Sequence, residues 1–130
     1  METAINQALH EARINGEEVC FVNAHGTATR DNDKVEGNVL ARIFGDRVHV
    51  YSTKGFTGHT LGAAGGLEAV FCCAALKKKW IPYSVGFVNK DDEISLTPIV
   101  EKTNIDGDFA VSTSLAFGGN NAALVISCIK

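Results

Sequence analysis

A chain of 130 residues is long enough for one domain with a hydrophobic core, and its 45% hydrophobic and 21% charged residues are ordinary for a globular domain. The formal net charge of −3 provides no basic surface for nucleic acid, and no apolar run is long enough to span a bilayer. Because the N-terminus lacks the basic and apolar segments of a secretory signal, we expect a cytoplasmic protein that binds neither nucleic acid nor membrane.

The first half of the chain alternates helical and strand patterns. Apolar residues at helical spacing predict a helix over residues 3–13, and the apolar run at 19–24 predicts a buried strand. Val35, Val39, Leu40, Ile43 and Phe44 mark a second amphipathic helix that Gly45 closes. Acidic side chains cluster at the beginning of that helix, where the positive end of the helix dipole favours them.

The second half continues the alternation of strand and helix patterns and ends in two consecutive strands. Residues 48–52 predict a strand, and 63–79 predict a long apolar helix that ends in three lysines. After a loop-rich stretch, the strands at 109–115 and 122–128 are joined by a short glycine-containing link typical of antiparallel hairpins. The element order αβαβαββ predicts an α/β fold, with helices layered on a mostly parallel sheet that has an antiparallel edge.

Two histidines stand where such a sheet places its ligands. His25 and His59 each follow a predicted strand closely, and each has glycine beside it, which lets a substrate approach the backbone. Two imidazoles at the ends of adjacent strands can converge on one substrate oxygen. We therefore interpret this pair as part of a site, and we interpret His10 and His49 as structural or surface residues.

One acidic residue interrupts the apolar pattern of the long helix. Glu68 would need a charged or hydrogen-bonding partner if it is buried, and Lys54 is the best candidate within sequence reach. The alternative is that Glu68 faces water. The turn at residues 117–120 is equally open to two interpretations, a plain hairpin turn or a mobile aromatic gate built on Phe117.

The segments 22–29, 54–65 and 117–120 together resemble the β-ketoacyl-acyl carrier protein synthases of the thiolase-like superfamily. The similarity is to the C-terminal half of the elongating, two-histidine type, and it runs over essentially the whole chain. It implies a thiolase-like fold and a decarboxylative Claisen condensation, in fatty acid or polyketide synthesis, in which a cysteine takes an acyl chain from acyl carrier protein. It implies no cofactor, and it implies a homodimer for the complete enzyme.

The resemblance also implies roles for individual residues. His25 and His59 would donate hydrogen bonds to the malonyl thioester oxygen and stabilise the enolate. Lys54, paired with Glu68, would set the electrostatics of the site, and Phe117 would be the gate between the acyl pocket and the malonyl entrance. Supporting positions would be Thr27, Thr29, Asp33, Gly118 and Gly119.

The chain departs from the family pattern in two ways. The gate usually has the sequence Gly-Phe-Gly-Gly-Thr-Asn, whereas here alanine stands at position 116 and asparagine at position 120, and Ala116 would stiffen the gate. The family's nucleophilic cysteine belongs to the N-terminal half, and no cysteine here occupies the corresponding position. Cys20, Cys72, Cys73 and Cys128 are interpreted as free buried thiols, without disulfide or zinc spacing.

We therefore expect residues 1–130 to form a single domain that is the C-terminal half of a ketosynthase, inactive without an N-terminal half that carries the nucleophile. The resemblance places the first strand of such a half in the centre of its sheet. Because this chain begins in the helix after that strand, we expect four strands with an unfilled central position.

The alternative to a catalytic half is a non-catalytic partner, similar to a chain length factor or a carrier-protein-binding subunit. Metal-dependent hydrolysis is disfavoured because no third ligand has metal spacing.

Overall fold

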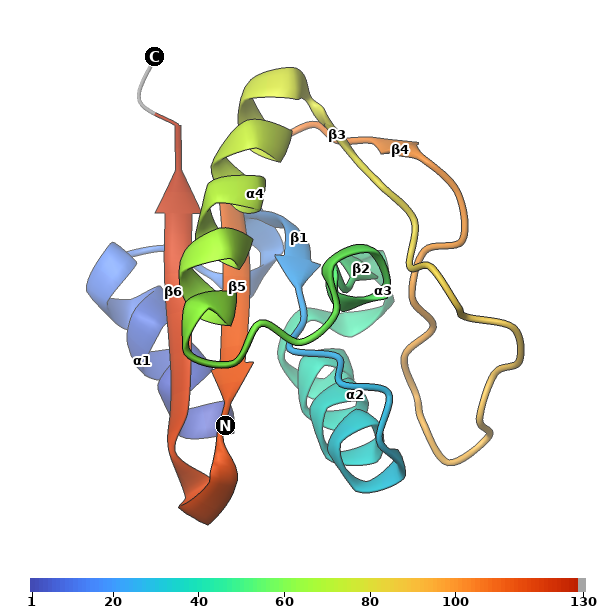
Figure 1. Cartoon of the computed structure of the whole chain (residues 1–130). Coiled ribbons are helices and arrows are strands. Elements are labelled where there is room, and N and C mark those ends of the chain that lie inside the picture. The colour runs from blue at the N-terminus through green and yellow to red at the C-terminus, as the bar shows by residue number, and fades with distance from the viewer. Residues whose placement is uncertain (129–130) are drawn as a thin grey trace.

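The computed structural model describes residues 1–128, which form three layers with helices on both faces of a mixed sheet (Figure 1). The order of helices and strands along the chain is α1 (Glu2–Ala12), β1 (Val19–Asn23), α2 (Arg30–Phe44), β2 (His49–Tyr51), α3 (Lys54–Thr57), α4 (Ala64–Lys78), β3 (Trp80–Ile81), β4 (Thr103–Asn104), β5 (Phe109–Leu115) and β6 (Asn121–Ser127). The predicted α/β class and the hairpin between the last two long strands are confirmed.

The main sheet has the strand order β2-β1-β5-β6, with the first three strands parallel and β6 antiparallel at the edge. The predicted unfilled position in the centre of this sheet is wrong. Strand β1 pairs directly with β5, in a register that places Val22 opposite Val111 and Asn23 opposite Ser112. Both valines are fully buried, and the direct pairing leaves no room for a further strand between β1 and β5.

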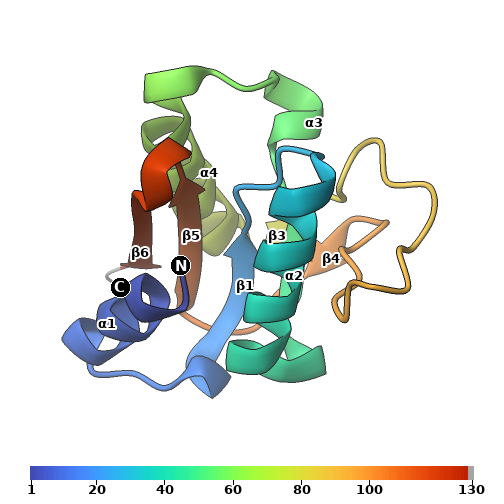
Figure 2. The same cartoon turned by 90° about the horizontal axis from the view of Figure 1, so that it is seen from below.

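Alternating side chains of the sheet form two separate hydrophobic clusters. Val22, Val50 and Val111 point to the face covered by α1 and α2. Their neighbours in the strands, among them Phe21 and Tyr51, point to the opposite face and pack on α4. Figure 2 shows α1 and α4 on opposite sides of β5 and β6. This arrangement explains why the strands are apolar on both faces rather than alternately apolar and polar.

Helix α4 is apolar on its outer side as well as on its inner side. The inner side buries Glu68, Cys72 and Leu76 against the sheet. The outer side leaves Leu67 40% exposed and Val70 63% exposed. A helix on the surface of a globular domain normally has a polar outer side, so the exposed apolar side chains of α4 are unusual.

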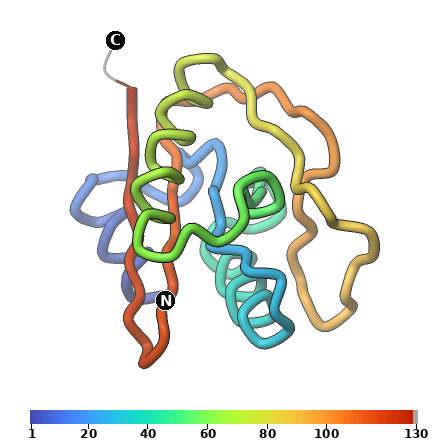
Figure 3. The backbone as a smooth tube through the Cα atoms, viewed as in Figure 1, coloured from blue at the N-terminus to red at the C-terminus, as the bar shows by residue number. Residues whose placement is uncertain are grey.

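A long segment between β3 and β4 runs beside β2 and α2, as the tube in Figure 3 shows. A backbone hydrogen bond joins it to β2, from the Ile99 N–H to the Val50 carbonyl (2.8 Å). Ion pairs of Glu93 with Arg30 and Lys34 join it to α2. The segment therefore forms a wall beside the carboxyl end of β2.

Some predicted details need correction. The sequence pattern did not indicate α3 or the two-residue strands β3 and β4, which are too short to show periodicity. Cys72 is fully buried and Cys20 and Cys128 are half-buried, but Cys73 is exposed because it faces away from the sheet on α4. All four cysteines are free thiols, as predicted. No helix within residues 1–128 has the length and hydropathy needed to cross a membrane.

Candidate active site

The two predicted histidines meet just beyond the carboxyl ends of β1 and β2. His25 follows β1 in a loop that leads to α2, and His59 follows the short helix α3. Their ring centroids are 5.3 Å apart and their planes are nearly perpendicular, at 83°. His25 is 6% exposed, whereas His59 is exposed. The expected convergence of the two imidazoles is therefore present in the fold.

The tautomer of His59 is set by its own loop. The Leu61 backbone N–H donates a hydrogen bond to His59 Nδ1, at 3.1 Å. Because Nδ1 is the acceptor, the ring hydrogen of the neutral imidazole is on Nε2. His59 can therefore present a hydrogen-bond donor outward from the loop.

Burial keeps His25 neutral. Loss of hydration lowers its pKa to about 4, and the nearby positive charge of Lys54 and the ring of His59 act in the same direction. A neutral imidazole is a hydrogen-bond donor through one nitrogen and an acceptor through the other. At neutral pH, His25 is thus suited to hydrogen bonding rather than to carrying a positive charge.

We expect NMR of the His25 imidazole to show titration with a pKa of about 4 rather than near its ordinary 6.5. Between these pH values the folded state binds fewer protons than the unfolded state. His25 therefore contributes stability that is present above pH 6.5 and lost as the pH falls toward 4. A chain with His25→Asn should lack that part of the acid destabilisation. Titration of His25 near its ordinary pKa would contradict this description of the site.

Lys54 and Glu68 form a buried ion pair, as the sequence predicted. Lys54 Nζ donates to Glu68 Oε1, and the two side chains are 6% and 3% exposed. Burial raises the pKa of Glu68, and the hydrogen bond and charge of Lys54 oppose that rise. The alternative in which Glu68 faces water is excluded by its burial. The pair places a shielded positive charge close to His25.

Sequence reasoning missed a second buried carboxylate, Glu36 of α2, which is 3% exposed. It accepts hydrogen bonds from the backbone N–H groups of His25 (2.9 Å) and Gly26 (2.8 Å). From the sequence, the acidic residues at this end of α2 were explained only by their favourable interaction with the helix dipole. The sequence did contain a signal for this burial. Glu36 stands three and four positions before Val39 and Leu40, so it lies on the same buried face of the helix.

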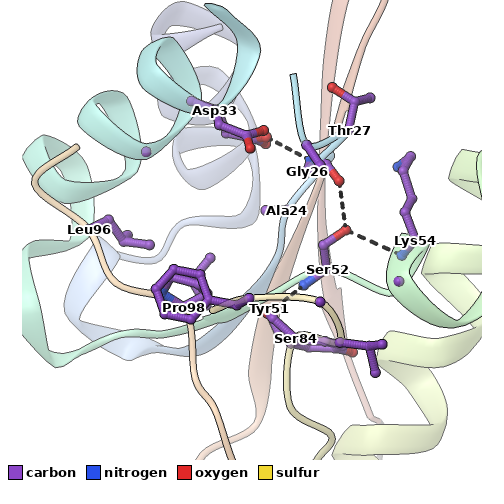
Figure 4. A pocket seen from close by; sticks show the side chains of 18 of the residues that line it. Ala24, Gly26, Thr27, Asp33, Tyr51, Ser52, Lys54, Ser84, Leu96 and Pro98 are labelled. Carbon is purple, nitrogen blue, oxygen red and sulfur yellow. Dashed lines mark hydrogen bonds between the residues drawn. The ribbon is translucent and has the colours of Figure 1, made fainter. Parts of the chain in front are cut away.

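Ser52 joins the two histidine loops. Its hydroxyl donates to the Gly26 carbonyl and accepts from the Lys54 backbone N–H, each at 3.3 Å. Figure 4 shows Ser52 between Gly26 and Lys54, with these contacts drawn as dashed lines. Gly26 has φ of +47°, and a Cβ added there would lie 2.5 Å from Ser52 Cβ. The close approach of the two loops therefore requires glycine at position 26.

We expect Gly26→Ala to destabilise the chain more than Gly118→Ala does. Both positions have a positive φ, of +47° and +79°, which costs about 1–2 kcal/mol for alanine. An added Cβ at Gly118 would lie 3.8 Å from the Asn120 amide, an ordinary van der Waals distance, whereas at Gly26 it would lie 2.5 Å from Ser52 Cβ. Urea denaturation should therefore show an additional loss of about 1–3 kcal/mol for Gly26→Ala. Equal losses for the two variants would contradict the close approach.

A cavity of about 730 Å³ opens beside this cluster. Thr27, Asp33, Lys54 and His59 contribute to its wall, together with apolar residues of the segment between β3 and β4. The volume is within the range of small-molecule pockets. Four of the sequence-predicted site residues thus surround one space at the carboxyl ends of the parallel strands.

The remaining predicted positions do not line this cavity. Thr29 is the N-cap of α2, and its hydroxyl lies 3.0 Å from that of Thr27. Phe117 is fully exposed at the turn between β5 and β6, and no described contact joins it to either histidine. Gly118 and Gly119 have φ of +79° and +81°. Ala116 has extended backbone, at φ of −135°, which alanine adopts without strain.

The cysteines do not supply a nucleophile to this cluster. The thiols of Cys20 and Cys128 donate to the backbone carbonyls of Phe109 and Cys73. Burial raises the pKa of Cys72 to about 12 and also raises that of Cys20, which disfavours the reactive thiolate. Within residues 1–128, no group of three or more His, Cys, Asp or Glu side chains could hold a metal ion.

Comparison with known proteins agrees with this fold. Residues 1–88 match the family described as "Beta-ketoacyl synthase, C-terminal domain". The chain therefore belongs to the β-ketoacyl synthase family, and the thiolase-like fold predicted from its motifs is confirmed by the solved structures that it matches.

Three relatives show the extent of the similarity. A 3-oxoacyl-acyl-carrier-protein synthase 2 of Staphylococcus aureus is 39% identical over 126 residues, which cover 94% of this chain and 31% of that protein. A β-ketoacyl synthase of Burkholderia phymatum is 34% identical with a TM-score of 0.95, over 99% of this chain and 32% of that one. A Xenorhabdus doucetiae ketosynthase, solved in complex with its chain length factor, gives 37% identity and a TM-score of 0.89, over 98% and 33%. The chain thus spans about a third of the length of these relatives.

Proposed function

We propose that this chain is the part of a ketosynthase that activates malonyl-acyl carrier protein for decarboxylative condensation. The observation that carries the proposal is the pair of imidazoles, 5.3 Å apart at the ends of adjacent parallel strands. Claisen condensation develops negative charge on a thioester oxygen, and hydrogen-bond donors placed beforehand stabilise that charge in the transition state.

Each histidine fits the role of donor. The contact with Leu61 leaves the Nε2 hydrogen of His59 available to a substrate. His25 is neutral at physiological pH because of its low pKa, and its ring is beside that of His59. Both can therefore donate to one oxygen without transferring a full proton to it.

The buried pair of Lys54 and Glu68 supports the same chemistry. The positive charge of Lys54 is held close enough to His25 to contribute to the lowering of its pKa. Glu68 prevents Lys54 from being an uncompensated buried charge. In this proposal Lys54 favours the neutral state of His25 and the developing negative charge of the enolate.

The nucleophilic cysteine would come from an N-terminal ketosynthase half. The chain covers only 31% of its Staphylococcus aureus relative, the thiols of Cys20 and Cys128 are bonded to backbone carbonyls, and Cys72 is fully buried. The exposed apolar side of α4, with Val70 at 63%, and the neighbouring Leu61 at 77% offer a surface for such a half. The proposed partners are therefore the N-terminal half and acyl carrier protein, within a homodimer of the complete enzyme.

Reconstitution tests this function. The chain would be co-expressed with a cysteine-bearing N-terminal ketosynthase half, and condensation of acyl- and malonyl-acyl carrier protein would be followed by mass spectrometry. We expect the two halves to purify together and to form the β-ketoacyl product, and we expect either half alone to form none. A complex that forms but yields no product would favour the non-catalytic role of a chain-length-factor-like partner. Failure of the two halves to associate would contradict the proposal.

A further inference from the structure

Two of the four free cysteines lie close together where β6 runs beside α4 (Figure 1). The Cys128 thiol donates to the Cys73 backbone carbonyl, with 3.7 Å between sulfur and oxygen. A carbonyl oxygen is about 2.4 Å from the Cα of its own residue, so Cys128 Sγ is within about 6 Å of Cys73 Cα. Because the Cα atoms of a disulfide are about 4–7 Å apart, a bond between these residues needs only a small local movement.

The place of Cys128 in the sheet leaves it free to make that movement. Strand β6 is at the edge of the sheet, and its pairing with β5 ends at Ser127, opposite Phe109. Cys128 lies just beyond this last pair, so a shift of Cys128 leaves the paired residues in place. Cys73 is exposed on α4, and rotation about its Cα–Cβ bond can direct its sulfur toward the end of β6.

The other two cysteines are not suited to such a bond. Cys72 is fully buried, and it projects from α4 about 100° away from Cys73, as successive residues of an α-helix do. The Cys20 thiol donates to the Phe109 carbonyl at 3.0 Å, and burial raises the pKa of both Cys20 and Cys72. Thiol–disulfide exchange requires an accessible thiolate, so an oxidant in solution would react at Cys73 and Cys128.

We propose that Cys73 and Cys128 are a site of reversible oxidation, at which a small-molecule disulfide such as oxidised glutathione joins them in an intramolecular disulfide. The thiolate of the exposed Cys73 attacks one glutathione sulfur, and the other glutathione leaves as a thiolate that takes up the proton of Cys73. The Cys128 thiolate then attacks the Cys73 sulfur of the mixed disulfide, and the second glutathione leaves and takes up the proton of Cys128. Two cysteine thiols are thereby oxidised to one disulfide while one glutathione disulfide is reduced to two thiols.

The cross-link would stabilise the folded chain. It joins residues 55 positions apart and closes a loop that contains β3, β4, β5 and β6. Closing a long loop restricts the unfolded chain more than the folded one. Neither cysteine lines the cavity beside the two histidines, so this inference does not depend on the proposed function.

The test uses the whole chain at a series of ratios of oxidised to reduced glutathione. Free thiols would be blocked by alkylation, and tryptic peptides would be mapped by mass spectrometry without reduction. We expect a link between peptides 55–77 and 103–130, with fragment ions that place the bond at Cys73 rather than at Cys72. The oxidised chain should have a urea midpoint about 1 M higher than the reduced chain, and dithiothreitol should reverse the shift.

Cys72→Ala is the matched control because it changes the adjacent cysteine of the same peptide, and it should keep both the link and the shift of the midpoint. Cys73→Ser and Cys128→Ser should each lose both. A link through Cys72 or Cys20, a disulfide between two chains, or a mixed disulfide with glutathione that persists at Cys73 would overturn the inference. Thiols that stay reduced at the highest ratio would also overturn it. If Cys72→Ala does not fold, the fragment ions of the unaltered chain decide between the two adjacent cysteines.

Discussion

Replacing His25 or His59 with alanine should lower the condensation rate of the reconstituted enzyme by about 10²–10³-fold, as removal of one oxyanion donor does elsewhere. The physical reason is that each imidazole supplies one donor to the same developing charge, from rings 5.3 Å apart. The rate would be measured as product formed from acyl- and malonyl-acyl carrier protein at saturating substrate.

The histidine prediction has internal controls. His10→Ala changes an exposed histidine on α1, and we expect it to leave the rate unchanged. Groups that act together on one charge are strongly non-additive, so the double variant of His25 and His59 should be little slower than either single variant. Multiplicative losses in the double variant would indicate that the two imidazoles act in separate steps.

Breaking the buried ion pair should have the largest effect on stability. Lys54→Met leaves Glu68, which is 2% exposed, without its cation, and removal of one partner of a buried pair costs about 3–5 kcal/mol. Replacing both members, as Lys54→Met with Glu68→Leu, should recover most of that loss because no buried charge is left. The free energy of unfolding from urea titrations would measure both changes.

The same variant has a predicted pH dependence. Burial already raises the pKa of Glu68, and Lys54 opposes that rise, so Lys54→Met should raise it further. A carboxyl with a raised pKa in the folded state contributes stability that is present at low pH and lost as the pH rises through that pKa. The deficit of Lys54→Met relative to the unaltered chain should therefore be small in acid and grow toward neutral pH. A deficit that is constant with pH would contradict the pairing.

The sequence predicted the helices and strands in which apolar residues recur at a regular spacing. The strand at Phe109–Leu115 has the predicted bounds, and α4 begins and ends within one residue of them. The burial of Glu68 was predictable because a single charge interrupts an otherwise apolar helix. These features depend on spacing within one element, which is visible in the chain itself.

Features that depend on pairing between distant segments were not predictable. Strand β5 is the direct neighbour of β1, and this pairing joins residues about ninety positions apart in the chain. Nothing in the sequence of either strand specifies the other as its partner. Glu36 was missed for the same reason, since its hydroxyl donor is Thr113, 77 residues away. The short helix α3, which begins at Lys54, has too few residues to show a period.

The most direct test separates the two half-reactions of the reconstituted enzyme. Transfer of the acyl chain to the N-terminal cysteine and release of carbon dioxide from malonyl-acyl carrier protein would be timed separately, with and without His25→Ala. If this chain activates malonate, acyl transfer should proceed at its usual rate while carbon dioxide release slows by about 10²-fold or more. Equal slowing of both steps, or slowing of neither, would contradict the assignment of the two imidazoles to the malonyl side of the reaction.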